Sequence, residues 1–495
     1  MTDPRGEQDD LAAIAKGGRT NLFGFFLRLA ARIPFLFIAG RAPGFGPAAL
    51  GVFASALVLI ELSAMICTLG EKRGLAQRLS DSDEHPANVI ADGSLIALIA
   101  SCAVALAFWL FPAPLFPGGN FTWIDRLMVL AIPPLALTEI WLAGLAYRFD
   151  VGATVRARSV VEPWTISIVA GIMALVAPRS GLAVAYLASV YATAIAAFVP
   201  FIKAYGLPRD WHPSLSSMGK LTLRSIPIAT ADAIEWGTRR LDIFILGLFA
   251  APSAVGVYYV AQQVASLPQK LKTSFEPILG PVITRNLKTR DYAAIARQVR
   301  QVGFWILAAQ IGIALALAIP GEGVMGLIGP QFVGGTGALA FLLAAEAVAA
   351  TAVVSEAALI YVARVRNLVV SVLTIGLQGL LTVGGILVMQ RLGYNELFQA
   401  AAAALALALA LGFASLVKSR ILANILAEPI NNWRWALIWA VAPAVLVGWA
   451  ATAFLPEWAE LALGIPGILA VYFGVLWLRA FGPDDRVLFQ KAPAT

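Results

Sequence analysis

The sequence predicts an all-α protein that crosses a membrane about fourteen times. Of its 495 residues, 59% are hydrophobic and only 13% are charged, and the mean hydropathy is +0.79. Soluble domains are roughly 45–50% apolar and about 25% charged. The apolar residues also fall into runs close to the ~20 residues that a helix needs to cross a bilayer. These observations exclude a soluble globular domain and a disordered chain, which would be polar and poor in aromatic residues.

Fourteen apolar runs of spanning length follow one another along the chain. Short segments separate them, and the fifth and sixth spans are separated only by Pro178–Ser180. The seventh and eighth runs are the least apolar of the set. The predicted spans are 21–40, 46–69, 92–116, 124–146, 160–177, 181–203, 224–249, 253–282, 301–320, 334–361, 367–389, 395–417, 434–455 and 461–480.

The charges of the connecting segments agree with this number of spans. With the N-terminus in the cytoplasm, the inner segments and the span ends next to them hold 26 of the 36 Lys and Arg residues, and the outer segments hold only Arg41, Arg179 and Arg391. Cytoplasmic segments of membrane proteins are enriched in Lys and Arg. A missed or invented span would reverse every later segment and destroy this asymmetry. We therefore expect both termini in the cytoplasm.

A weak internal repeat predicts how the spans are organised. The segment Gly51–Ala56 (GVFASA) opens the second span, and Gly256–Ala261 (GVYYVA) opens the eighth. The offset of 205 residues corresponds to six spans, so two parallel halves are expected, with substrate sites between them. The alternative is a chance likeness of two small-residue helix starts. The predicted organisation is an N-terminal lobe of six helices (1–219), a C-terminal lobe of six (220–427), and two extra helices with a cytoplasmic tail (428–495).

Ionisable and polar residues inside the spans are the candidate site residues, because a charge at a helix centre costs about 2.5–3.5 kcal/mol. Two arginines share a face of the first span, four acidic or basic residues share an arc of the seventh, and polar residues line one face of the eighth. The alternative is internal salt bridging, for example between Glu235 and Arg239 at i,i+4. Candidates for substrate binding are Arg28, Arg32, Arg239, Arg240, Gln263 and Lys270, and candidates for ion coupling are Asp242, Glu235 and Asp232.

Four further carboxylates lie singly in other spans. Each of them is either a proton-coupling group or the partner of an arginine on another span. They are Glu61, Glu139, Glu346 and Glu356.

The sequence contains few motifs or residues that are typical of an enzyme or a cofactor site. No P-loop, no dinucleotide-binding glycine motif and no G-x-S-x-G motif is present, and the only histidines are His85 and His212 in polar loops. The longest outer segment, 112–123, is too short for a catalytic domain. We expect a protein without catalytic activity, metal or other cofactor, and without nucleic-acid binding.

The stretch from Arg224 to Asn286 carries several motifs in a fixed order. They are S-x-P, R-R-L-D-I-F-I-L-G-L-F, V-G-V-Y, S-L-P and P-V-I-T-R-N-L. This arrangement resembles the polysaccharide-transporter family, which includes the O-antigen flippases of the multidrug/oligosaccharidyl-lipid/polysaccharide exporter superfamily. The stretch Asn21–Gly51 is similar to the first hairpin of that family. The matching residues are Ser225, Pro227, Asp242, Gly247, Gly256, Tyr258, Pro268 and Pro281.

The resemblance implies a two-lobed transporter that works by alternating access. Its expected substrate is a lipid-linked oligosaccharide, a polyprenyl-pyrophosphate glycan, which it would move across the inner membrane. A glycan polymerase and glycosyltransferases are the expected protein partners. The alternatives are a peptidoglycan-precursor flippase, a drug/cation antiporter of the same superfamily and, from another class, a membrane glycan polymerase.

Overall fold

We describe the fold from a computed structural model. It describes residues 33–482 and 485, except positions 83, 120, 149, 179, 214, 274–282, 284–285 and 288. All regular structure in these residues is helical. Arg28 and Arg32 lie outside the described residues, as does most of the first predicted span.

Eleven helices of the described chain are long and apolar enough to cross a membrane. They coincide with eleven of the fourteen predicted spans. Of the other three spans, two correspond to the helices α10 (Leu215–Phe249) and α11 (Pro252–Thr273), which are long but carry more polar residues. The chain is therefore a multi-pass helical membrane protein, and the total of about fourteen spans stays a prediction.

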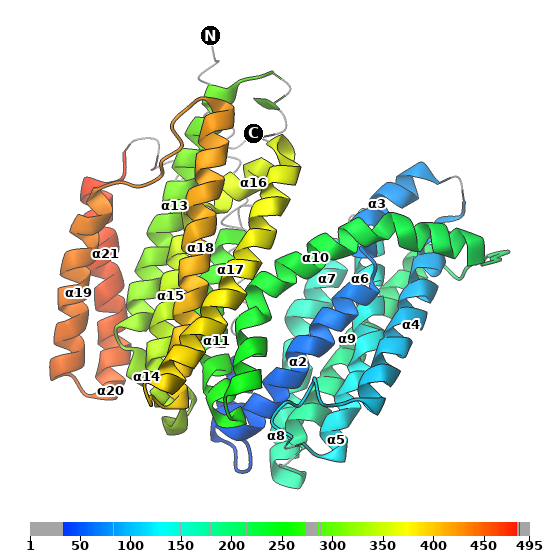
Figure 1. The fold of residues 1–495 in the computed structure, drawn as a ribbon, viewed down its shortest axis with the longest axis horizontal. Helices are drawn as coiled ribbons and strands as arrows, with labels where there is room; N and C mark the ends of the chain where they lie inside the picture. Colours follow the sequence, from blue (N-terminus) through cyan, green and yellow to red (C-terminus); the bar gives the residue numbers. More distant parts are fainter. Residues whose placement is uncertain are drawn as a thin grey trace. The chain divides into compact units, whose positions relative to one another are not determined.

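The described helices form two compact units, with a border between Tyr259 and Val260 inside α11. The N-terminal unit contains α10 and the start of α11, and the C-terminal unit contains the rest of α11 and all later helices (Figure 1). The predicted lobe boundaries at 219/220 and 427/428 stay predictions. The other elements of the N-terminal unit are α2 (Pro47–Cys67), α3 (Glu71–Asp81), α4 (Pro86–Leu110), α5 (Trp123–Arg126), the 3-10 helix η1 (Leu127–Ala131), α6 (Ile132–Tyr147), α7 (Val151–Val155), the π-helix η2 (Arg156–Val161), α8 (Glu162–Val176) and α9 (Gly181–Tyr205).

The C-terminal unit contains a hairpin of its last two long helices, α19 and α21, which pack against each other and against α13. Its elements after α11 are α13 (Tyr292–Ala318), α14 (Gly321–Ile328), the 3-10 helix η3 (Pro330–Gly335), α15 (Thr336–Ala350), α16 (Val353–Val362), α17 (Arg364–Arg391), α18 (Glu396–Leu426), α19 (Ala436–Phe454), α20 (Glu457–Ala459), the π-helix η4 (Glu460–Gly464) and α21 (Ile465–Arg479).

Each unit has its own apolar core. In the N-terminal unit, Ile90, Ile140 and Ala197 bring α4, α6 and α9 together. In the C-terminal unit, α13 packs on the α19–α21 hairpin, where the Tyr472 hydroxyl donates to the Ala308 carbonyl at 2.9 Å. A Cβ on Gly312 would lie 2.9 Å from the Tyr472 ring, so glycine allows this close packing.

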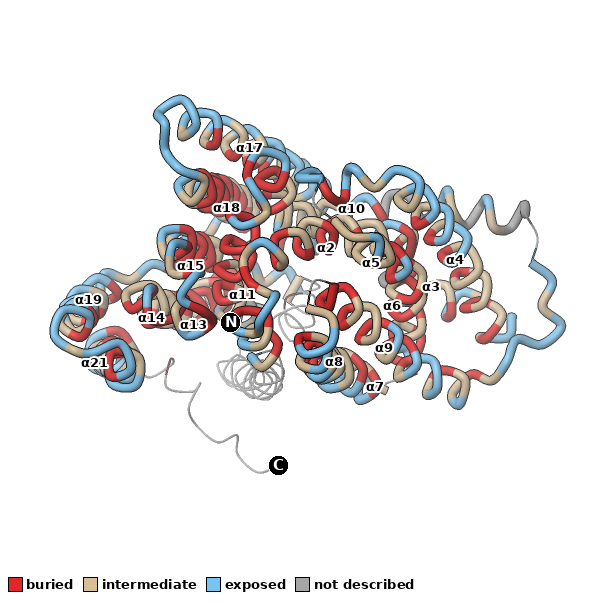
Figure 2. Tube along the Cα trace, turned by 90° about the horizontal axis from the view of Figure 1, so that it is seen from below, coloured by how far each residue is buried: buried red, intermediate tan, exposed pale blue. Residues whose placement is uncertain are grey.

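Large apolar side chains also cover the outside of the helices. Leu380 on α17 is 76% exposed and Trp439 on α19 is 71% exposed. Figure 2 shows buried residues along α18, whereas α17, α19 and α21 carry long exposed stretches. Such apolar surfaces are typical of helices in contact with lipid.

Local sequence signals explain where several helices begin and break. Asn395 caps α18, because its side chain accepts hydrogen bonds from the backbone N–H groups of Leu397 and Phe398. The predicted span 334–361 is broken between α15 and α16. The carbonyls near the break accept hydrogen bonds from Ser415 Oγ at 3.1 Å and Asn432 Nδ2 at 3.0 Å, so polar groups freed by the break remain satisfied.

Candidate functional site

The helix α10 carries most of the residues that the sequence predicts for coupling and binding. Its best-defined polar contact is at Asp242, whose side chain is fully buried. The Tyr258 hydroxyl donates to Asp242 Oδ2 at 2.5 Å, and the Ile243 backbone N–H donates to Asp242 Oδ1 at 2.9 Å. Because Tyr258 is also fully buried, this contact joins α10 firmly to the start of α11.

The other predicted site residues differ in how far their side chains are exposed, and some of these side chains are not described. Arg239 is exposed and Arg240 is half-buried, although they are neighbours on α10, and both make further interactions. Gln263 is half-buried on α11. Among the predicted residues, the structure thus brings Asp242 together with Tyr258 and leaves Arg239 on the surface. The backbones of Asp232, Glu235 and Lys270 lie in α10 and α11, but their side chains are outside the described part of the chain.

A second charged site lies in the N-terminal unit, between α6 and the π-helix η2. The Arg158 guanidinium donates to Glu162 Oε2 at 2.8 Å and also to Glu139 Oε1. All three side chains are only 21–28% exposed. The three residues belong to the candidate spans Trp123–Tyr147 and Gly152–Val176, so Arg158 is a cation held between two carboxylates on apolar helices.

Two more polar groups belong to this arrangement. The Tyr186 side chain on α9 is 8% exposed, and its hydroxyl has no hydrogen-bond partner. The charged side chains of Glu61, Glu162 and Arg158 lie near enough to act on it electrostatically. The group therefore combines three carboxylates, one guanidinium and one unpaired hydroxyl within a single unit. We call Glu61, Glu139, Arg158, Glu162 and Tyr186 the acidic cluster.

The sequence analysis found only part of the acidic cluster. It identified Glu61 and Glu139 as single carboxylates, but it placed Arg158 in a cytoplasmic segment. In the structure α7 begins at Val151 and the helical path continues through the π-helix into α8, so Arg158 lies inside a helix that starts before the predicted span at 160. The i,i+4 spacing of Arg158 and Glu162 was the signal that could have revealed the pair.

A third charged site lies in the C-terminal unit, where α16, α17 and α18 meet. Lys418 Nζ donates to Glu356 Oε1 at 2.6 Å and to Ser371 Oγ at 3.2 Å. The Lys418 side chain is 6% exposed, whereas that of Glu356 is 46% exposed. The predicted spans put Lys418 in the cytoplasmic segment after 417, whereas α18 continues to Leu426 and keeps Lys418 within the helix. Glu356 is thus the partner of a lysine, whereas the sequence analysis expected either an arginine partner or a coupling role.

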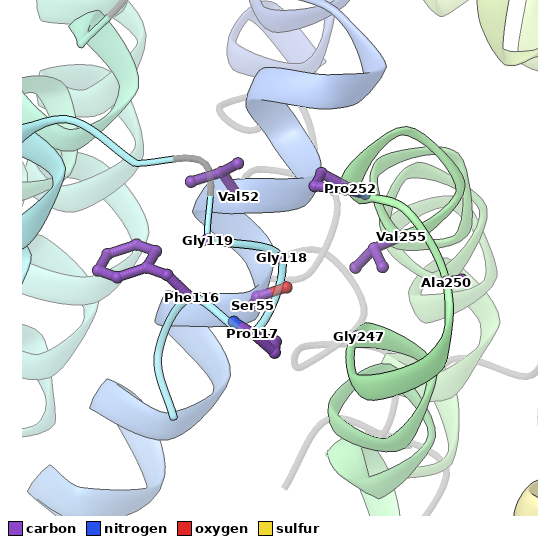
Figure 3. A pocket seen from close by; sticks show the side chains of 10 residues that line it. All are labelled: Val52, Ser55, Phe116, Pro117, Gly118, Gly119, Gly247, Ala250, Pro252 and Val255. Carbon is purple, nitrogen blue, oxygen red and sulfur yellow. The ribbon is translucent and has the colours of Figure 1, made fainter. Parts of the chain in front are cut away.

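A small pocket lies in the N-terminal unit between α2, the end of α10 and the start of α11 (Figure 3). The segment from Phe116 to Gly119 closes one side of it. Apart from the Ser55 hydroxyl, the side chains that line it are apolar, so this pocket offers little for binding a charged substrate. Its lining residues are Val52, Ser55, Phe116, Pro117, Gly118, Gly119, Gly247, Ala250, Pro252 and Val255. In the described residues, no group of three His, Cys, Asp or Glu side chains is arranged to hold a metal ion.

These features define a multi-pass helical membrane protein with ionised groups buried between its spans. The chain belongs to the family described as "Polysaccharide biosynthesis protein", whose profile matches residues 45–328. This confirms the family that the motifs between Arg224 and Asn286 indicated. No curated protein sequence matches the chain.

Solved structures with a similar fold come from membrane transporters. An inward-facing multidrug-resistance MATE transporter of the MOP superfamily has a TM-score of 0.63 and 15% identity, covering 81% of this chain and 98% of its own. The lipid II flippase MurJ, in an inward closed conformation, has a TM-score of 0.64 and 12% identity, covering 94% and 99%. A MOP superfamily transporter from Pyrococcus furiosus has a TM-score of 0.57 and 16% identity, covering 86% and 96%. At these identities the likeness shows a shared fold.

Proposed function

We propose that this protein is a flippase that moves a lipid-linked oligosaccharide across the bacterial inner membrane by alternating access. One observation carries the proposal: the polysaccharide biosynthesis profile matches residues 45–328 of a chain in which eleven described helices are long and apolar enough to span a membrane. Such a chain suits the step in which a finished polyprenyl-pyrophosphate glycan crosses the membrane. The fold shared with transporters supports the same step.

The charged residues fit a substrate with a pyrophosphate. Arg239 is exposed on α10, and Arg28, Arg32, Arg240, Gln263 and Lys270 are the other residues that we assign to binding. Arginine suits this role, because its planar guanidinium can make two hydrogen bonds to phosphate oxygens. No nucleotide-binding motif is present, so we assign the energy input to an ion gradient, with Asp242, Glu235 and Asp232 as coupling residues.

We further propose a non-enzymatic protein in the inner membrane, with both termini in the cytoplasm. Its protein partners would be the glycan polymerase and the glycosyltransferases that act after and before translocation. A membrane glycan polymerase is the less favoured reading, because the described outer segments are short.

A peptidoglycan-precursor flippase is the second candidate function. The observation in its favour is the coverage of 94% of this chain in the comparison with the lipid II flippase. Both candidate substrates carry a polyprenyl pyrophosphate, and they differ in the sugar part. The test must therefore distinguish the glycans.

Deletion of the gene, followed by identification of the lipid-linked glycan that accumulates on the cytoplasmic side, tests the proposal. We expect an unpolymerised oligosaccharide lipid that disappears when the gene is restored. Accumulation of the peptidoglycan precursor would support the second candidate. Normal glycan lipids together with increased drug sensitivity would instead indicate a drug antiporter. Accumulation of glycan lipid on the outer side would indicate a polymerase.

A further inference from the structure

A buried carboxylate without a partner lies where the α19–α21 hairpin turns. Glu460 is the first residue of the π-helix η4, and its side chain is only 8% exposed. Among the residues that the structure describes, none donates a hydrogen bond to this carboxylate and no cation pairs with it. Burying an unpaired charge is costly. The carboxylate therefore needs a proton or a cation that the described chain does not supply.

Apolar contacts with two other helices bury this residue. The π-helix η4 packs against α19, where a Cβ on Gly464 would lie 3.0 Å from the Ala451 Cβ. It also packs against α14, where a Cβ on Gly323 would lie 3.3 Å from the Leu461 side chain. Figure 1 shows α14 and α20 at the same end of the C-terminal unit. A π-helix is rare and occurs frequently at functional sites.

The charged groups closest to Glu460 are themselves acidic. Glu322 on α14 and Glu457 on α20 are the charged side chains that act on it electrostatically, and both residues are exposed. The helix α19, which packs on the other side, carries no charged residue. We call Glu322, Glu457 and Glu460 the outer carboxylates, because the predicted topology puts the ends of α13 and α19 outside. Such a concentration of negative charge attracts cations.

The geometry of the outer carboxylates favours an organic cation. In the described part of the chain, no group of three acidic side chains is arranged to hold a metal ion. A primary ammonium group is larger and carries three N–H donors that point in different directions. It can therefore bond to carboxylates that are too far apart for one metal ion. Hydrogen bonds between an ammonium and a carboxylate are also among the strong ones in proteins.

The surroundings of the outer carboxylates point to an ammonium group carried by a lipid. Trp458 directly follows Glu457 and is 72% exposed, and Phe454 and Leu463 are 78% and 61% exposed. Tryptophan is enriched where membrane helices reach the lipid headgroups. A phospholipid bound here would place its headgroup beside the carboxylates and its acyl chains on the apolar side chains.

We propose that the outer carboxylates bind the ammonium headgroup of a phospholipid, such as phosphatidylethanolamine, at the turn of the α19–α21 hairpin. The ammonium group donates to Glu460, and the exposed Glu322 and Glu457 hold it from the outer side. The lipid thereby supplies the partner that the buried carboxylate lacks and ties the hairpin to α14. The assignment to the outer leaflet rests on the predicted topology, whereas the site itself does not depend on the transported substrate.

Lipid binding to the full-length protein in detergent tests the proposal. Native mass spectrometry measures the affinities for phosphatidylethanolamine, for phosphatidylcholine, whose ammonium has no N–H donor, and for phosphatidylglycerol, which has no ammonium. Phosphatidylethanolamine should bind about tenfold more tightly than the other two, and Glu460→Gln should remove this preference, because hydrogen bonds to a charged group are lost. Equal affinities for the three lipids, or an unchanged preference in Glu460→Gln, would overturn the proposal.

Variants at exposed positions keep the test decisive if Glu460→Gln disturbs folding. Glu322→Gln and Glu457→Gln should each weaken the binding of phosphatidylethanolamine by about two- to fivefold, as expected for exposed charges. Glu396→Gln is a matched control, because it removes a carboxylate from the first turn of α18 on the same predicted side. It should leave the lipid preference unchanged. Equal effects of all three variants, or no effect of Glu322→Gln and Glu457→Gln, would refute the site.

Free ethanolamine distinguishes a lipid from a soluble amine. It carries the same ammonium group but has no acyl chains to cover the hairpin. At a concentration equal to that of the lipid, it should not displace phosphatidylethanolamine. If it binds as tightly as the lipid does, the site accepts a soluble amine and the lipid assignment is wrong. None of these measurements uses an oligosaccharide lipid, so their results and those on the proposed transport function remain separate.

Discussion

Arg158 should contribute strongly to stability because it is the cation between Glu139 and Glu162 inside the membrane-spanning part. We choose Arg158→Met, which keeps an unbranched apolar side chain but removes the charge. The change leaves two neighbouring carboxylates that no longer share a guanidinium.

The loss of unfolding free energy expected for Arg158→Met follows from the geometry and burial of the site. At a separation of 4 Å and an effective dielectric constant of 20, each attraction amounts to about 4 kcal/mol before desolvation is counted. Removing one partner of a buried pair typically costs about 3–5 kcal/mol. The side chains are 21–28% exposed, so we expect the lower end, about 3 kcal/mol.

Arg156 offers a matched control in the same π-helix. Its side chain is 61% exposed, and its nitrogen lies 3.7 Å from Asp150, which is 41% exposed. Exposed pairs of this kind contribute about 0–1 kcal/mol. Arg156→Met should therefore have little effect, although it removes the same charge from the same helix.

Thermal stability of the protein in detergent measures the difference. For a folding unit of about 150–250 residues, 1 kcal/mol corresponds to roughly 2–4 °C. Arg158→Met should therefore lower the midpoint by about 6–12 °C, and Arg156→Met by less than about 4 °C. Adding Glu139→Gln and Glu162→Gln to Arg158→Met should restore most of the loss, because it removes the unpaired charges. Equal effects of the two arginine variants, or no recovery in the triple variant, would refute the reasoning.

Three further predictions concern topology, binding and coupling. Single cysteines from Gly119→Cys and Gly393→Cys should react with an impermeant reagent from outside, whereas Ser217→Cys and Asn286→Cys should not; reversed labelling would contradict the topology. Alanine at Arg28, Arg32 or Arg239 should reduce transport while the protein still inserts, and lysine should restore only part of it; normal transport by all three alanine variants would exclude them from binding. Asp242→Asn should abolish transport driven by a pH gradient but leave substrate binding measurable, and unchanged gradient dependence in both this variant and Glu235→Gln would reject coupling through these acids.

The composition and the periodic apolar runs predicted the fold class and eleven of the spans seen as helices. These features are local, because a spanning helix needs only a continuous apolar stretch of sufficient length. The motifs between Arg224 and Asn286 were also local and sufficient to identify the family. Arg28 and Arg32 of the first span and the side chains of Asp232, Glu235 and Lys270 lie outside the described residues, so their roles stay predictions.

The tertiary structure decided which charged groups meet and where backbones touch. Sequence patterns identified Glu139 as a lone acid and assigned Arg158 and Lys418 to cytoplasmic segments. The partners of these residues come from other helices, or depend on where a helix begins, and neither is encoded in apolar periodicity. The repeat around Gly51 and Gly256 was visible in the sequence, but only the folded chain shows that each glycine packs on a proline carbonyl of the other copy. The apolar runs determined the helices, because helix formation depends on neighbouring residues, whereas charge pairing and close packing depend on residues that only the fold brings together.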